Sequence, residues 1–283
     1  MMNYMQFPGG RQKALTLSYD DGVQQDIRML EILDRYGIKC TFNINGYAFE
    51  EEEERSYAEG QIHRRMARRE AIEVYSKAIA NGHEVATHGY SHPFLDKLPP
   101  EMVAYEIVEN RKCLEEMFGT IIKGHAYPYG TTSNQVVEIL RNCGILYART
   151  TVPTKRFDIP TDWLRMPATC HHNASDLMQL VDQFLNEPVR YPFPKLFYLW
   201  GHTYEFEVNN NWEVIEKFSE AIGNRDDIWY ANNMQVYEYV EAYRALEFSS
   251  NGNIVHNPTA LTVWFTTGGI NVKVEPGETI RIR

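Results

Sequence analysis

The feature of this sequence that most constrains its fold is a recurring order of helix, glycine and strand. Residues 23 to 36 place apolar side chains at helical spacing, Gly37 follows them, and residues 38 to 44 have the composition of a strand. A glycine directly after a helix is typical of a residue that ends the helix in the left-handed conformation. Because strands that alternate with helices form parallel sheets, this order predicts an α/β protein.

The same order recurs along the rest of the chain. Helices are expected to end at Gly82, Gly119 and Gly144, and apolar segments that suit strands follow each of them. With the opening strand, about seven units result, and we expect them to close into a distorted (β/α) barrel. The other expected elements are strands at 14–17, 84–86, 121–122, 145–148 and 195–200, and helices near 175–186, 212–222 and 233–247.

The last part of the chain follows a different pattern. From about residue 250 apolar and polar residues alternate over 261–265, 270–274 and 279–281, and Gly268-Gly269 suits a hairpin turn. This predicts a three-stranded β-meander. A segment this short cannot fold alone, so we expect it to pack on the barrel or to join two copies of the chain in a homo-oligomer. The expected division is therefore a barrel domain over 1–249 and an appendage over 250–283.

Two neighbouring carboxylates follow the opening strand. Asp20 and Asp21 stand at the end of the apolar run 14–17, and Gly22 comes next. Neighbouring side chains of a strand point to opposite faces, so both aspartates can reach one ligand only if the chain turns there. Gly22 permits that turn. A solvated Asp-Gly turn is the plainer interpretation of this segment alone.

A pair of histidines follows the third expected strand. His88 and His92 are four residues apart, which lets both imidazoles meet on a tight loop or a helical turn. Together with one carboxylate they would form a metal site that leaves coordination positions open for water and substrate. Structural or surface histidines are the alternative.

Taken together, these segments resemble the polysaccharide deacetylases, which share the NodB-homology domain. The family's first motif, T-F/Y-D-D-G, stands here as Ser18–Gly22, with serine for the usual threonine. The second, H-S/T-x-x-H, stands here as His88–His92, with Gly89 in place of the hydroxyl residue. The resemblance implies a NodB-like barrel in which Asp20 is the catalytic base. It also implies that the metal, Zn²⁺ or another divalent ion such as Co²⁺, binds to Asp21, His88 and His92.

The third motif, R-x-P-Y/F, is matched only in part. Ala126 occupies the position of the arginine that normally orients the base, whereas Pro128 and Tyr129 are retained. The resemblance implies that the backbone N–H of Tyr129 stabilises an oxyanion. Arg165 and Arg149, both at strand ends, are candidates to replace the arginine. We prefer Arg165, because family members without the motif-three arginine look similar there, and an ordinary ion pair is the alternative for both.

The last two motifs are also present. Asp162-Trp163 resembles the fourth motif, in which the tryptophan walls the acetyl pocket, although a barrel-core tryptophan is the alternative. Gly201-His202 resembles the fifth motif, L-x-H, with Trp200 at the leucine position. The resemblance implies that His202 is a catalytic residue, the acid. The candidates for contact with the substrate are Trp163, Pro128 and Trp200.

The resemblance implies removal of acetyl groups from N-acetylated amino-sugar oligomers or polymers. Asp20 would take the proton from a water activated by the metal, and His202 would protonate the departing amine. O-acetyl esters remain open as substrates. So do three other functions: a hydrolase of a small non-sugar amide such as a cyclic ureide, a sugar-binding module without turnover, and an assembly module that acts through the β-rich tail.

Composition limits the partners. A net charge of −10 argues against nucleic acid and anionic membranes, because either requires a cationic surface. Aromatic residues make up 13% of the chain, which suits contact with sugar rings. The first residues show no basic segment followed by an apolar core, and no stretch reaches the ~20 apolar residues of a membrane span. We therefore expect a cytoplasmic protein.

Overall fold

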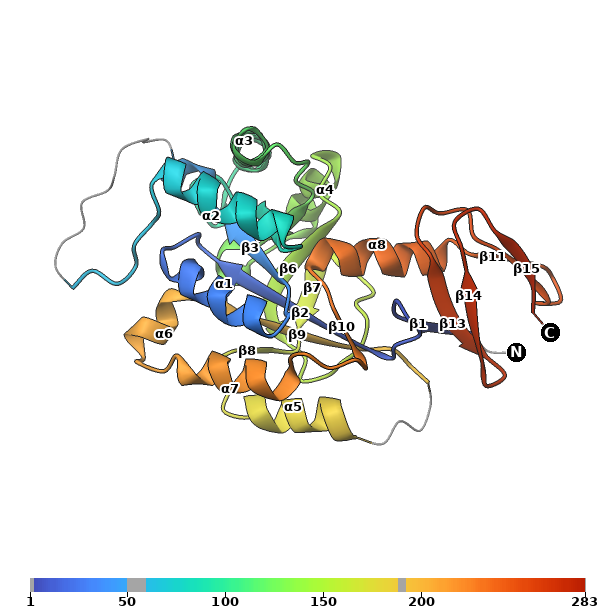
Figure 1. Ribbon diagram of the computed structural model, residues 1–283. Helices are drawn as coiled ribbons and strands as arrows, with labels where there is room; N and C mark the ends of the chain where they lie inside the picture. Colours follow the sequence, from blue (N-terminus) through green and yellow to red (C-terminus); the bar gives the residue numbers. More distant parts are fainter. Residues whose placement is uncertain (1–2, 50–59, 188–191, 283) are drawn as a thin grey trace.

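A parallel sheet, nearly closed into a barrel, forms the centre of the molecule in the computed structural model, which describes residues 3–49, 60–187 and 192–282. The strands are Lys13–Asp20 (β2), Cys40–Ile44 (β3), Glu84–Thr87 (β4), Gly124–Ala126 (β5), Tyr147–Pro153 (β6), Met166–Ala168 (β7), Cys170–His171 (β8), Lys195–His202 (β9) and Ile228–Tyr230 (β10). Their order is β7-β6-β5-β4-β3-β2-β9-β8, with β10 beside β2 (Figure 1). The predicted α/β barrel is confirmed.

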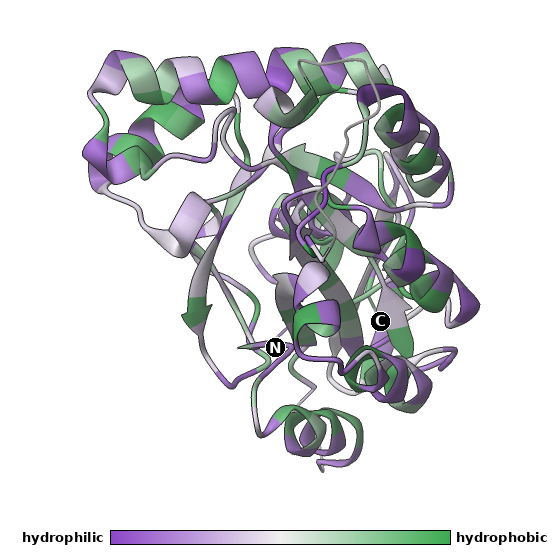
Figure 2. Cartoon of the chain, turned by 90° about the vertical axis from the view of Figure 1, so that its left-hand side faces the viewer, coloured by the Kyte–Doolittle hydropathy of each residue, from purple (hydrophilic) through white to green (hydrophobic). Residues whose placement is uncertain are grey.

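Helices surround these strands, as the view from the left-hand side of Figure 1 shows (Figure 2). The four glycines at 37, 82, 119 and 144 all have φ between 63° and 88°, which confirms the predicted left-handed helix ends. Among the described residues, no helix is both long and apolar enough to cross a membrane. The α-helices are Gln25–Arg35 (α1), Arg68–Ala80 (α2), Pro100–Phe118 (α3), Asn134–Asn142 (α4), Leu177–Asn186 (α5), Tyr204–Val208 (α6), Glu213–Ile222 (α7) and Asn233–Arg244 (α8). Short 3₁₀ turns lie at Gly46–Phe49, Leu95–Lys97, Pro128–Gly130 and Trp163–Arg165.

One predicted strand is wrong. Residues 121 and 122 lie before β5, which begins at Gly124, and the side chain of Ile121 is 71% exposed. The apolar pair was therefore not evidence of a buried strand. The short strands β7, β8 and β10 were not predicted, because two or three residues are too few to show a period.

Strand β2 is the central strand of the barrel. All of its residues except the first are buried, and it pairs with β9 along its whole length. On its other edge, β10 pairs with the first half and β3 with the second half. The register places Asp20 opposite His202 at the carboxyl ends of β2 and β9. The fold thus brings two predicted catalytic residues together.

The C-terminal strands form a small two-sheet structure near both chain termini (Figure 1). It lies at the end of the barrel opposite to the carboxyl ends of β2 and β9. The hairpin of β13 and β14 confirms part of the predicted meander, but the predicted third strand, β15, pairs with β12 in the other sheet. The free edge of β13 is taken instead by β1, from the other end of the chain. These strands are Asn3–Gln6 (β1), Glu247–Phe248 (β11), Ile254–His256 (β12), Val263–Thr267 (β13), Ile270–Val274 (β14) and Thr279–Arg281 (β15).

An apolar core joins this structure to α8. Phe265 of β13 is fully buried in a cluster with Val255 and Val274, and Ala242 and Leu246 extend the cluster to the C-terminal end of α8. The tail therefore packs on the rest of the chain. The domain boundary at residue 250 and self-association through the tail remain predictions.

The first test concerns this core. Phe265→Ala should lower the free energy of unfolding by about 3–5 kcal/mol, because it removes a buried ring and leaves a cavity. Ile270→Ala, in the same hairpin, should change it by no more than about 0.5 kcal/mol, because that side chain is 52% exposed. Chemical denaturation of both variants measures the difference. Equal small effects would contradict the packing of the tail on α8.

Candidate active site

The predicted turn after β2 is present. Asp21 has φ of 84° and Gly22 has φ of 64°, so the chain leaves the extended conformation directly after Asp20. As a result, Asp20 and Asp21 both approach the same imidazole. The Nε2 atom of His88 lies 3.8 Å from Oδ2 of Asp20 and 3.9 Å from Oδ1 of Asp21.

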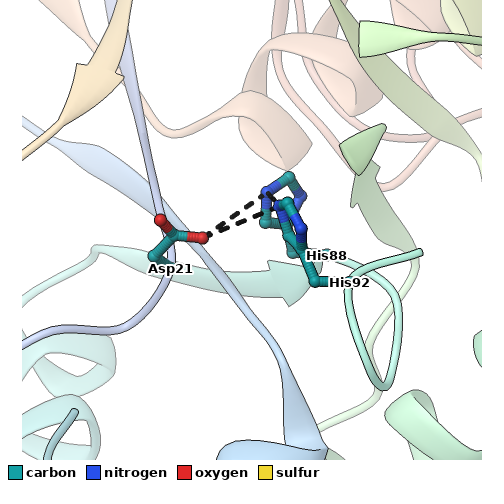
Figure 3. Close-up of side chains that lie close together, drawn as sticks. All are labelled: Asp21, His88 and His92. Atoms are coloured by element: carbon teal, nitrogen blue, oxygen red, sulfur yellow. Dashed lines mark hydrogen bonds and ion pairs between the residues drawn. The ribbon is translucent and has the colours of Figure 1, made fainter. Parts of the chain in front are cut away.

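Asp21, His88 and His92 form a compact group of three side chains (Figure 3). The Oδ1 atom of Asp21 lies 3.9 Å from Nε2 of His88 and 3.8 Å from Nε2 of His92. The two Nε2 atoms are 3.1 Å apart. Since zinc binds nitrogen and oxygen ligands at about 2.0–2.2 Å, atoms this close together can hold one ion.

The protonation of His88 also fits a metal ligand. Its Nδ1 lies 2.8 Å from the carbonyl oxygen of Ala126 and donates to it, which leaves the lone pair on Nε2, the atom that faces Asp21 and His92. Burial lowers the pKa of His88 to about 4, so the imidazole is neutral at physiological pH. One carboxylate and two such imidazoles are a donor set that suits Zn²⁺ or Co²⁺.

The loop that carries both histidines explains one departure from the family motif. Gly89 has φ of 70°, and a Cβ atom there would lie 3.3 Å from the side chains of Pro93 and Pro128. A serine or threonine would be strained at this position. Buried Pro128 thus lies against the loop of His88 and His92, while its predicted contact with substrate stays a prediction.

The arginine beside Asp20 is Arg149. Its guanidinium donates to both carboxylate oxygens of Asp20, at 2.6 Å to Oδ1, and Asp20 and Arg149 are 2% and 0% exposed. Arg149 on β6 is the register partner of Ala126 on β5, so the neighbouring strand supplies the guanidinium that position 126 lacks. The preference for Arg165 is wrong, because that side chain binds Asp162 and Asn134 on the surface.

Asp20 is held as a carboxylate. Burial alone would raise its pKa, but the charge of Arg149 beside it outweighs burial and lowers the pKa. Nδ2 of Asn43 also donates to Oδ1 of Asp20 at 2.8 Å. The arrangement therefore presents an ionised, oriented acceptor for a proton beside the group of Asp21, His88 and His92.

His202 lies on the other side of Asp20. Its Nε2 atom is 3.8 Å from Oδ2 of Asp20, and its Nδ1 atom is 2.9 Å from Oε1 of Glu205. Burial disfavours the imidazolium, but the hydrogen bond to Glu205 and the nearby carboxylates outweigh it and raise the pKa of His202. Trp200 packs its ring against the guanidinium of Arg149, with 4.6 Å from the guanidinium carbon to the ring centre.

Tyr129 stands at the mouth of the site. It has φ of 59°, and its ring centre lies 4.6 Å from that of His92 and 3.8 Å from that of Phe94.

Trp163, by contrast, is a core residue. Its Nε1 donates to Glu241 of α8 at 2.8 Å and its ring packs on Tyr237, so the predicted contact of Trp163 with substrate is wrong. The alternative of a barrel-core tryptophan is the one found.

Three residues near the site were missed. His63 and Arg65 lie 3.2 and 3.6 Å from the two carboxylate oxygens of Asp21, but they come from a segment without any sequence signal. Glu205 was also missed. Its position three residues after His202 is the spacing of side chains that meet on one helical turn, and this could have revealed it.

The second test compares the two arginines. Arg149→Ala leaves the buried carboxylate of Asp20 without its charged partner, so the free energy of unfolding should fall by about 3–5 kcal/mol. Arg165→Ala breaks a partly exposed pair and should cost no more than about 1 kcal/mol. Urea denaturation of both variants gives the comparison. A larger loss in Arg165→Ala would contradict the placement of Arg149.

Comparison with known proteins agrees with this geometry. Residues 8–148 match the family model described as polysaccharide deacetylase. A chitooligosaccharide deacetylase of Azorhizobium caulinodans is 23% identical over 53% of this chain and 63% of its own length. A peptidoglycan-N-acetylglucosamine deacetylase of Listeria monocytogenes is 26% identical over 44% of this chain and 23% of its own. The chain thus spans less than two thirds of these relatives.

Two solved structures share the fold. A Mycobacterium smegmatis protein described as a polysaccharide deacetylase superimposes with a TM-score of 0.59 at 17% identity, over 85% of this chain and 94% of that one. The Xyl-CE4 domain of a xylanase from the hindgut metagenome of Trinervitermes trinervoides gives 0.51 at 16% identity, over 85% and 99%. From the family match, the motifs and the fold, we conclude that this chain belongs to the polysaccharide deacetylase family.

Proposed function

We propose that the chain is a metal-dependent deacetylase that hydrolyses N-acetyl groups of amino-sugar oligosaccharides or polysaccharides and releases acetate. The observation that carries this proposal is the ionised, buried Asp20 beside the donor set of Asp21, His88 and His92. When bound there, Zn²⁺ or another divalent ion such as Co²⁺ supplies a Lewis acid that makes water more acidic and polarises a carbonyl.

Residues of the chain carry out the proton transfers and stabilise the negative charge that develops during the reaction. Asp20, held by Arg149, accepts the proton of the attacking water. The backbone N–H of Tyr129 donates to the oxygen that becomes negative as the acetamide carbonyl is attacked. His202, whose pKa is raised, donates the proton of its Nε2 to the departing amine. Trp200, which packs on Arg149, contacts the substrate beside Asp20.

Exposed aromatic rings at the mouth support a sugar substrate. Tyr129 and Phe94 are 53% and 44% exposed, and their rings stack at 3.8 Å beside His92. Flat rings of this kind suit the apolar faces of sugars. The relatives named above act on chitooligosaccharides and on N-acetylglucosamine of peptidoglycan, which favours the same class of substrate for this chain.

The third test separates the roles of the two neighbouring aspartates. Asp20→Asn keeps size and polarity but cannot accept a proton, so bound zinc should persist while acetate release falls by about 10²–10⁴-fold. Asp21→Asn removes a charged ligand and should lose zinc and activity together. Metal analysis and acetate release from acetylated chitooligosaccharides measure both. Asp162→Asn, in an exposed pair, is the matched control.

Three results would contradict the proposal. Normal turnover by Asp20→Asn would show that Asp20 is not the catalytic base. Unchanged zinc content in Asp21→Asn would show that Asp21 is not a metal ligand. A wild-type protein that binds acetylated chitooligosaccharides without releasing acetate would be a sugar-binding module instead of an enzyme.

A further inference from the structure

Three imidazoles surround the carboxylate of Glu205, which lies in α6 directly after β9. The Oε1 atom of Glu205 is 2.9 Å from Nδ1 of His202. Its Oε2 atom is 2.9 Å from Nε2 of His172 and 3.4 Å from Nε2 of His171. Both oxygens therefore have imidazole partners, and one of these partners is the proposed acid.

The arrangement is a hydrogen-bonded cluster instead of a second metal centre. The backbone N–H of Asn173 donates to Nδ1 of His171 at 3.1 Å, so the proton of a neutral His171 is on Nε2. That nitrogen faces Glu205 as a donor and has no lone pair for a metal. Nδ2 of Asn173 donates to Oε2 of Glu205 as well, at 2.9 Å.

Strand β9 has a glycine, Gly201, at the position where the ring of His172 packs. A Cβ atom at Gly201 would lie 2.0 Å from Nδ1 of His172, so only glycine leaves room for that ring. His172 is 1% exposed, and its ring stacks on those of both Tyr19 and Phe206. Its Nε2 atom lies beside Oε2 of Glu205, whose other oxygen, Oε1, faces His202.

We propose that Glu205 is a positioning residue for His202. It accepts a hydrogen bond from the Nδ1–H of His202, which turns Nε2 toward Asp20 and the proposed substrate, and its charge stabilises the imidazolium that donates a proton to the amine. The inference rests on the proposed amide hydrolysis. Its geometry is independent of that reaction and can be tested separately.

Several charged and titratable groups face His202, and Glu205 is the carboxylate bonded to it. Asp20 and Asp21 face it from the end of β2, with Oδ2 of Asp20 at 3.8 Å. From α6, the ring of Tyr204 lies 5.4 Å away, and from β8 the ring of His171 lies 6.2 Å away. Removing the charge of Glu205 should therefore lower the pKa of His202 and leave the other groups in place.

The fourth test uses Glu205→Gln, with Glu207→Gln on the same helix as the matched control, because Glu207 contacts Gln25 and Arg64 instead. Nitrogen NMR of the histidine rings should show His202 of Glu205→Gln titrating at lower pH than in the wild type. Acetate release from acetylated chitooligosaccharides should fall, at most by the roughly 10²–10⁴-fold that a general acid contributes. Hydrolysis of an activated aryl acetate, whose phenolate leaves without a proton, should fall much less.

The outcomes decide between the alternatives. If His202 titrates at the same pH in the wild type and in Glu205→Gln, the positioning role is wrong. A second zinc ion per chain that Glu205→Gln removes would also overturn it, in favour of a metal centre. Glu205→Asp keeps the charge and should preserve the titration of His202 better than Glu205→Gln does. If the wild type releases no acetate, the proposed function fails, but the NMR comparison still tests Glu205.

Discussion

The buried ion pair between Asp20 and Arg149 is the interaction on which the site depends. A carboxylate this deeply buried would take up a proton without a compensating charge, because its removal from water costs several kcal/mol. Arg149 supplies that charge from β6, and Asn43 adds a hydrogen bond from β3. An ionised Asp20 can then serve as a base and can attract the protonated form of His202 across the sheet.

Around this pair, the site is built from strained turns on a rigid barrel. Asp21, His92 and Tyr129 all have positive φ although none is glycine, and they follow β2, β4 and β5 at the same end of the sheet. Each such residue costs about 1–3 kcal/mol, a cost that a well-packed scaffold can sustain. The paired strands and their apolar core provide that scaffold. The rigid barrel thus holds three strained residues where metal, base and oxyanion donor are proposed to act.

The barrel and the predicted metal ligands could be derived from the sequence because their signals are local. Helical spacing, glycine helix ends and the motifs around Asp20 and His88 each lie within a few residues. The choice between Arg149 and Arg165 could not be made in this way. It depends on the register that sets Arg149 beside Ala126, and register joins segments far apart in the chain. The pairing of β15 with β12 and the approach of His171 and His172 to Glu205 were missed for the same reason.

The central claim is that Asp21, His88 and His92 hold a divalent cation next to Asp20. Anomalous X-ray diffraction at the zinc absorption edge, from crystals of zinc-loaded protein, tests it directly. We expect one anomalous peak within ligand distance of Oδ1 of Asp21 and the Nε2 atoms of His88 and His92. A peak at Glu205 and His171 with none at Asp21, or no peak at either place, would contradict it.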